Sequence, residues 1–419
     1  MKQKELTPLK KGTSTFNLVG RAIVNDYTFG LDKNSSKSDW IYNQMRLSVD
    51  CGEDGKFTAE SMGGYGASRQ NKVYVHGKKQ NDTGREVDDF DNRFEIDWED
   101  RLDEDNFDVI GDMCFFEVGL EKDTNDKTVS KKFLTQYDMI QYISDNIEDG
   151  MIVNIKGNIT YSEYEGNPQI NREVKSIFLS SATEDKFRAS FIQTMLVDID
   201  SVEKPDKETK TISVLPAVVE YTREFNEQQV FGKDKRGNIK DKPGMMLPLR
   251  KQFFIRYTDE TLDKVKKLLK IMRPKKKGTV NEITVEGRFN KMGETLDTKE
   301  VTLDDLDDET REMIEAGYLD EKEILDKIAF SQGGSKKPDM MVITKPHLKI
   351  TTTGEGENKK TVTSLDKKEG IYTEDDIDTL EVINYFGRLG NEEEDDEEPQ
   401  EEVSEDTEAE DEVDSWFED

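Results

Sequence analysis

The chain has 419 residues and a formal net charge of −32, with 33% hydrophobic and 36% charged residues. This length leaves room for two domains, but so high a charged fraction also requires long solvated segments. No stretch approaches the roughly 18–20 apolar residues of a membrane span, and the N-terminus lacks the apolar core of a secretory signal. We therefore expect a cytoplasmic protein with no membrane contact.

The acidic residues are concentrated in two segments. Residues 391–419 contain 18 acidic residues and no basic ones, and residues 88–108 contain 11 acidic residues against two arginines. The rest of the chain is only mildly acidic. Because local fields matter more than the total charge, basic surfaces can still form there.

The first half of the chain predicts several strands and one helix. Short β-branched and aromatic runs, bounded by Gly, Asn, Asp or Ser, are typical of strands. Apolar residues recur every three or four positions over residues 133–147, which predicts a helix capped by Gly150. The acidic residues 88–108 have no strong period and predict a loop insertion. Strands are expected at residues 16–29, 40–49, 72–76, 112–120, 151–161 and 172–179.

The second half repeats this order. A helix is expected from Asp259 until Pro274 stops it. Residues 153–159 (VNIKGNI) resemble residues 283–289 (ITVEGRF), with Gly157 and Gly287 at matching places. A repeat of this length indicates duplicated domains rather than a solenoid. Strands are expected at residues 187–200, 211–221, 252–257, 283–289, 299–303 and 340–352, and a polar loop at 354–370.

Three strands, a helix and a two-strand hairpin follow the order of the five-stranded OB barrel. We therefore predict a mainly β chain with some α: two tandem OB-like barrels with insertions and a disordered acidic C-terminal tail. The expected domains are a first barrel at residues 1–184 with an acidic insertion near 80–110, a second barrel at 185–352 with a charged helical addition near 306–334, a linker with a short ordered piece at 353–390, and the tail at 391–419.

A dense basic cluster lies on and after the second predicted helix, with no acidic residue inside it. Lysines that contact phosphates release counterions, so the cluster predicts a nucleic-acid contact. The alternative is a solvated helix face whose lysine stems cover apolar surface. The cluster consists of Lys264, Lys266, Lys267, Lys270, Arg273, Lys275, Lys276 and Lys277.

Aromatic residues interleave the predicted strands. Single-stranded DNA is held by stacking its bases on such rings beside a basic groove, whereas a ring on the inner face of a strand belongs to the core. Both interpretations stay open for each ring. The candidates are Trp40, Tyr42, Tyr65, Tyr74, Tyr161, Tyr164, Phe254, Tyr257 and Phe289, together with Arg69. Tyr65 and Arg69 lie in a glycine-rich segment, residues 63–69, that we expect to be a mobile loop, either an ordinary one or one that folds over DNA.

Chemistry-bearing residues are sparse. The chain has two cysteines, Cys51 and Cys114, and two histidines, His76 and His347. Residues scattered in this way give no zinc pattern and no nucleophile–base grouping, and the acidic segment 88–108 lacks the Gly and Glu of an EF-hand loop. We expect no enzyme activity, no cofactor, no metal and no disulfide.

The C-terminal end carries a resemblance. Bacterial and phage single-stranded-DNA-binding proteins combine OB barrels with a disordered acidic tail that ends in apolar residues, and this tail resembles theirs. Residues 153–177 also resemble the last hairpin of that family's barrel. The resemblance implies two anchor rings flanked by acidic residues. These are Trp416 and Phe417 as anchors, with Asp411, Glu412 and Asp414 as flanking charges.

This sequence departs from the family pattern in two ways. The bacterial tail closes on a terminal Phe, whereas Glu418 and Asp419 follow Phe417 here. The insertions and the second barrel resemble a phage replication protein more than the compact bacterial form.

The sequence therefore predicts a protein that coats single-stranded DNA without sequence preference during replication or recombination, in the cytoplasm of a bacterial cell or phage-infected host. Its tail is expected to recruit replication or recombination proteins and to compete with DNA for the basic cluster. The alternatives are an acidic phage structural or assembly protein and a DNA mimic that inhibits DNA-binding enzymes. Neither explains the cluster at residues 264–277.

Overall fold

The computed structural model describes residues 5–81, 84–164, 167–291, 339–353 and 360–390, together with Ile314, Val413 and Trp416. The chain divides into two compact units, residues 1–289 with 341–419 and residues 290–340. The fold below is that of the first unit. The expected domain boundary at residues 184–185 stays a prediction. The strand expected at 299–303 and the helical addition expected near 306–334 lie outside the described residues, apart from Ile314.

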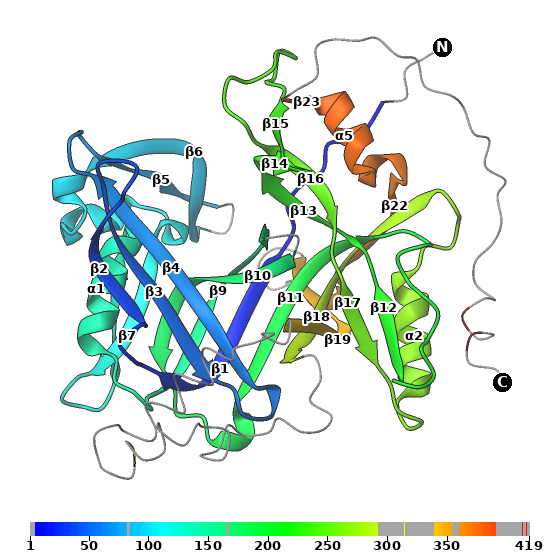
Figure 1. The fold of residues 1–419 in the computed structure, drawn as a ribbon, viewed down its shortest axis with the longest axis horizontal. Helices are drawn as coiled ribbons and strands as arrows, with labels where there is room; N and C mark the ends of the chain where they lie inside the picture. The colour runs from blue at the N-terminus through cyan, green and yellow to red at the C-terminus, as the bar shows by residue number, and fades with distance from the viewer. Residues whose placement is uncertain are drawn as a thin grey trace. The chain divides into compact units, whose positions relative to one another are not determined.

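Five strands of the first half pair with one another so that each has two neighbours within the set (Figure 1). We call such a closed set of strands a circuit. β1 pairs with β3 and β9, β3 pairs with β4, and β9 pairs with β10, all antiparallel. β10 closes the circuit by pairing in parallel with β4, where Glu173 lies opposite Glu60. These strands are β1 (Ser14–Ile23), β3 (Trp40–Asp50), β4 (Lys56–Gly66), β9 (Ile152–Tyr164) and β10 (Asn167–Leu179).

The second half forms a circuit of the same connectivity. β11 pairs with β13 and β18, β13 with β16, and β12 with β17; β17 pairs in parallel with β19, which lies beside β18. The second and third strands of this circuit are each interrupted. The elements are β11 (Arg188–Val197), β12 (Thr211–Val214), β13 (Ala217–Thr222), β16 (Met245–Arg250), β17 (Phe253–Arg256), β18 (Thr279–Lys291) and β19 (Asp339–Pro346).

The two circuits share one sheet, because β1 and β11 pair antiparallel from Ser14 opposite Gln193 to Val19 opposite Arg188. The core therefore runs through both. Phe289 lies 5.7 Å from Phe57 and 5.3 Å from Phe191 between ring centroids. The buried guanidinium of Arg172 lies 4.2 Å from the Phe289 ring centroid, within the range of a cation–π contact.

A helix precedes the fourth strand of each circuit, as expected. α1 (Gln136–Asn146) begins after Thr135, whose side chain accepts a hydrogen bond from the backbone N–H of Asp138, and it packs against β3, β4 and β7. It ends before Ile147, so the prediction of a Gly150 cap was wrong, although Gly150 has a φ of +85° in the turn that follows. α2 (Leu262–Met272) ends just before Pro274, as predicted.

The acidic segment is partly a hairpin, which corrects the loop prediction. β6 (Glu86–Asp97) pairs with β5 (Lys72–Gln80). Lys72 forms an ion pair with Asp97, and Lys79 with Asp89, so opposite charges face each other across the strands. Ile96 of β6 is buried with Val75 and Phe115 in a small separate cluster. Periodicity missed the hairpin because most of its side chains are solvated.

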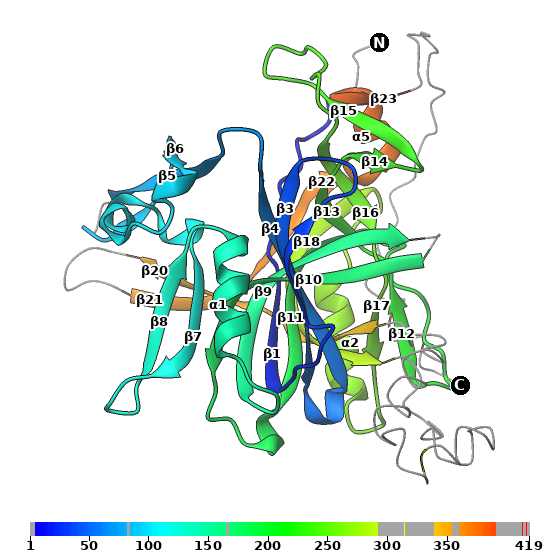
Figure 2. The ribbon, with the colours of Figure 1, turned by 60° about the vertical axis from the view of Figure 1, so that its left-hand side comes forward.

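Two other predicted loops are strands. Residues 63–66 belong to β4 and pair with β3 as far as Trp40 opposite Gly66, so this part of segment 63–69 is not a mobile loop. Within residues 354–370, β21 pairs with β20 as a separate ribbon, and β22 pairs with β18 (Figure 2). These elements are β20 (Leu348–Thr353), β21 (Lys360–Leu365) and β22 (Lys367–Thr373).

The remaining elements lie at the edges of this framework. The short ordered piece expected within residues 353–390 is α5 (Thr379–Phe386) followed by β23 (Gly387–Leu389), which pairs with β15. The other strands are β2 (Phe29–Asn34), β7 (Phe116–Lys122), β8 (Thr128–Phe133), β14 (Glu224–Phe225) and β15 (Gln228–Gly232).

Gly157 allows the close approach of β9 to β10. A Cβ at this position would lie 1.9 Å from the backbone carbonyl oxygen of Glu173, beside the bulge between Val174 and Ser176. We expect Gly157→Ala to lower the free energy of unfolding by about 1–3 kcal/mol, because the backbone must shift to admit a methyl group. Urea denaturation measures the loss. Gly150→Ala is not a suitable control, because its φ is positive, whereas a stability unchanged by Gly157→Ala would contradict the packing argument.

Candidate functional site

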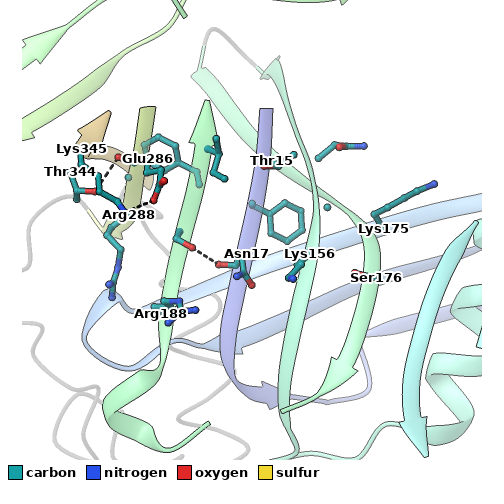
Figure 3. A pocket seen from close by; sticks show the side chains of 17 residues that line it. Thr15, Asn17, Lys156, Lys175, Ser176, Arg188, Glu286, Arg288, Thr344 and Lys345 are labelled. Atoms are coloured by element: carbon teal, nitrogen blue, oxygen red, sulfur yellow. Dashed lines mark hydrogen bonds and ion pairs between the residues drawn. The ribbon is translucent and has the colours of Figure 1, made fainter. Parts of the chain in front are cut away.

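A groove of about 710 Å³ crosses six neighbouring strands, in the order β10, β9, β1, β11, β18 and β19 (Figure 3). Both circuits contribute three strands each. The groove is lined by five basic side chains and one acidic side chain, Glu286, and we call it the basic groove. The basic residues are Lys156, Lys175, Arg188, Arg288 and Lys345.

The acidic residue is already neutralised. Glu286 accepts hydrogen bonds from Lys345 Nζ and His347 Nδ1, both at 2.9 Å. Burial raises the pKa of Glu286, but these two hydrogen bonds outweigh it and hold the pKa below its usual value. The carboxylate therefore stays ionised at neutral pH and cancels only part of the positive charge of the groove.

Two cations at the centre of the groove are exposed. Lys156 and Arg188 form no ion pair with any residue that the structure describes. Lys175 is half-buried, with its ammonium 4.2 Å from the Phe116 ring centroid, and burial lowers its pKa. Exposed cations without a carboxylate partner are available to an anionic ligand.

Arg288 is held by a buried carboxylate. Asp54, in the short turn between β3 and β4, accepts hydrogen bonds from Arg288 Nε at 2.8 Å and from the backbone N–H of Ala189 at 2.7 Å. Asp54 is 6% exposed. Asp54 of the first circuit thus holds the guanidinium of Arg288, a groove cation of the second circuit, in a fixed position.

The groove suits a chain of phosphates better than a stacked base. Its rings, Phe16 and Phe191, are each only 2% exposed and lie under the floor. Between the cations it presents uncharged polar groups that can donate or accept hydrogen bonds. These are Thr15, Asn17, Asn158, Ser176, Ser190 and Thr344.

The basic cluster predicted from the sequence lies elsewhere. Lys264, Lys267 and Lys270 are exposed on α2, and residues 275–277 are exposed just after it. Lys266 is half-buried, and Arg273 is only 6% exposed. None of the eight cluster residues, all of which the structure describes, lines the basic groove.

The predicted stacking rings of the second half and of the β9–β10 hairpin are mostly buried or half-buried against other residues. Phe289 has no exposed surface, so its predicted stacking role is corrected to a core role. Tyr161 is half-buried and donates a hydrogen bond to Gln193 Oε1 at 3.0 Å. Tyr257 packs against the core, and Phe254 is half-buried on β17. Tyr164 lies in β9, and its side chain is outside the described part.

The predicted rings of β3 and β4 lie on opposite faces of the sheet, because Tyr65 pairs with Ile41, whose neighbours Trp40 and Tyr42 point the other way. Trp40 and Tyr42 of β3 are half-buried and stack with centroids 4.7 Å apart. Tyr65 of β4 is half-buried beside Trp98, at 5.1 Å. Arg69 follows β4 and is exposed, and Tyr74 is exposed on β5. None of these rings lines the basic groove.

Only two residues of the tail are described. Val413 is 1% exposed, and Trp416 is half-buried with the Arg273 guanidinium carbon 4.6 Å from its ring centroid. The other predicted tail residues, Asp411, Glu412, Asp414 and Phe417, lie outside the described residues.

Cys114, His76 and Asp88 lie together, although their sequence spacing gave no sign of it. His76 Nε2 lies 2.7 Å from Asp88 Oδ1, and Cys114 Sγ lies 3.2 Å from His76 Nδ1 and 3.8 Å from Nε2. Such similar distances place the sulfur over the ring and out of line with the Nδ1 lone pair. The thiol is therefore poorly placed to transfer its proton to the imidazole, as nucleophilic catalysis requires.

Both thiols should react slowly in the folded chain. Burial raises the pKa of Cys51 to about 12 and also raises the pKa of Cys114. Because the thiolate is the reactive form, we expect Cys51 to react with a disulfide reagent at pH 8 more than about 100-fold more slowly than in urea. Cys114→Ser isolates the Cys51 signal. Equal rates in buffer and in urea would show that Cys51 is accessible as a thiolate.

Among the residues that the structure describes, no group of three or more His, Cys, Asp or Glu residues is placed to hold a metal ion. No helix in that part of the chain has the length and apolar composition needed to cross a membrane.

A weak signal for the groove was present in the sequence. The matched glycines of the two halves both line it, and each has a basic neighbour, in Lys156-Gly157 and Gly287-Arg288. On β9, Lys156 is exposed between buried neighbours, as an alternating strand requires. The sequence did not show which strands lie beside β9 and β18.

Comparisons with known proteins are remote. A family model described as YorF matches residues 101–239, well under half of the chain. No curated protein matches significantly. Among solved structures, the wild-type single-stranded DNA binding protein from Thermus aquaticus matches with a TM-score of 0.26, and a deletion mutant of it with 0.28. Both are 10% identical and cover 67% of this chain, and 87% and 88% of their own. The chain is mainly β, and its structural neighbours include single-stranded-DNA-binding proteins, but likeness at this level carries no argument about its function.

Proposed function

We propose that this chain is a non-catalytic protein that binds single-stranded DNA, with the phosphate backbone lying along the basic groove. The observation that carries the proposal is the charge of the groove. In a chain of net charge −32, five basic side chains gather where the two circuits meet, and the single acidic side chain among them, Glu286, is paired with one of the five, Lys345. Such a surface attracts a polyanion of extended shape.

The strand order supports an OB-type architecture for both circuits. Each has three strands, a helix and two further strands, and each closes with a parallel pair between its third and fifth strands. We propose that the circuits are two tandem OB barrels. In OB folds the second and third strands carry ligand contacts, and β3 of the first circuit carries Trp40 and Tyr42 on one face. We assign base stacking to these rings.

The wider role follows from this binding mode. A groove that contacts phosphates and rings that stack any base give little sequence preference. We therefore propose a coating protein for DNA in replication or recombination, in the cytoplasm of a bacterial cell or phage-infected host, with the acidic tail as the recruiting element for protein partners.

A titration with oligonucleotides tests the proposal. We expect poly-dT to bind the full chain more tightly than a duplex of the same length, and the logarithm of affinity to fall linearly with the logarithm of salt concentration. Fluorescence anisotropy of labelled oligonucleotides measures both. Binding that is absent at low salt, or equal for single and double strands, would overturn the proposal. Absent binding would favour the alternatives, a structural protein or a DNA mimic.

A further inference from the structure

The outer face of α2 is a basic surface that the proposed function leaves without a ligand. Val265, Leu268, Leu269 and Met272 are buried in the core, so the lysines of the helix point away from it. We call the exposed lysines of α2 and residues 273–277 the α2 surface. It lies outside the basic groove, and the one acidic residue of α2, Asp263, precedes it in the first turn of the helix.

Two residues of the tail pack against the body of the chain. Val413 is almost fully buried in the same apolar cluster that contains Leu268, Leu269 and Met272, and Trp416 packs against that cluster. The Trp416 ring lies under the guanidinium of Arg273, at the C-terminal end of α2. A cation–π contact to a guanidinium that is largely desolvated is stronger than one in water.

Charge favours the same pairing. The tail, residues 391–419, has 18 acidic residues and no basic ones, whereas residues 264–277 have eight basic residues and no acidic ones. Because the tail is tethered to the body, its effective concentration at a surface within reach is in the millimolar range. Even a weak contact is then occupied most of the time.

We propose that the α2 surface is a docking site for an acidic peptide with apolar anchors, and that the chain's own tail is its occupant, with Val413 and Trp416 as anchors. This inference goes beyond the proposed function. The basic cluster then binds a protein ligand, the basic groove stays open to nucleic acid, and a partner that recognises Trp416 must first displace it from Arg273.

The docking can be followed in the full chain labelled with 5-fluorotryptophan. The chain has three tryptophans, Trp40, Trp98 and Trp416, so Trp416→Phe assigns the tail resonance. In buffer we expect this resonance to differ from its position in urea and to be as broad as those of the body. Val413→Asp should move it to the urea position and sharpen it, because a carboxylate cannot be buried among apolar side chains without a partner.

Matched variants separate docking from general charge effects. Val403→Asp adds the same charge to the tail and should leave the resonance in place. Lys267→Glu with Lys270→Glu should release Trp416, whereas Lys235→Glu with Lys240→Glu, on an exposed loop elsewhere, should not. These variants alter only exposed or tail positions, so the body stays folded.

Three results would overturn the proposal. The first is a Trp416 resonance at the urea position in the unmodified chain. The second is a docked fraction that rises with protein concentration, which would assign the docked tail to a second copy. The third is release of Trp416 by saturating poly-dT, which would make the α2 surface a nucleic-acid site. Since the readout needs no DNA, a failure of DNA binding leaves this test intact.

Discussion

Replacing both Lys156 and Arg188 by Glu is expected to lower the affinity for poly-dT on the order of 100-fold at low salt. Both side chains are exposed in the basic groove, so the substitutions remove two phosphate contacts and add two repulsive charges. On single strands each lost phosphate contact makes the salt dependence shallower by about 0.7 in logarithmic slope, so a decrease of about 1.4 is expected for the pair. A titration at several salt concentrations gives both numbers.

The control is a pair of substitutions on α2 that changes the charge by the same amount as the groove pair. Lys264→Glu with Lys267→Glu alters exposed lysines of the predicted basic cluster and leaves the groove intact. If the phosphates run along the groove, this pair changes the affinity only by its long-range field and by release of the acidic tail, and the loss stays well below that of the groove pair. A larger loss from the α2 pair than from the groove pair would place the DNA on the cluster that the sequence pointed to.

Phe289→Ala is expected to lower the free energy of unfolding by about 3–5 kcal/mol, as for other buried Phe residues. The ring has no exposed surface and contacts Phe57, Phe191 and the guanidinium of Arg172. Its loss leaves a cavity where the two circuits meet and removes a partner of a buried cation. Urea denaturation followed by circular dichroism measures the change.

DNA affinity distinguishes this core role from the stacking role expected from the sequence. Phe289→Leu keeps most of the apolar volume, so it should recover most of the stability and bind poly-dT as the unmodified chain does. A Phe289→Ala protein of undiminished stability but weaker DNA binding would show instead that the ring stacks on bases.

The sequence by itself predicted elements whose signals are local. The three- to four-residue apolar period of α2 and the stop at Pro274 set its position closely, because its buried face is defined by consecutive turns of one helix. The alternating apolar residues of residues 40–49 likewise predicted β3. The order of strands and helix, which suggested the two repeated halves, is also a property of the chain alone.

The acidic hairpin shows where local signals failed. β5 and β6 are held by ion pairs between strands and by a small core that includes Ile110 and Phe115 from further along the chain. Composition predicted a solvated segment, which is correct for most of its side chains. It could not predict strands whose pairing depends on residues that the segment itself does not contain.

The basic groove was decided only by the tertiary structure. Its cations come from β10, β9, β11, β18 and β19, and each strand contributes a single lysine or arginine. They form one site because β1 pairs with β11, which joins the two circuits edge to edge. Strand pairing is a long-range contact that depends on the shared core. The sequence therefore showed the basic residues that are neighbours along α2, but it could not show those that become neighbours across the sheet.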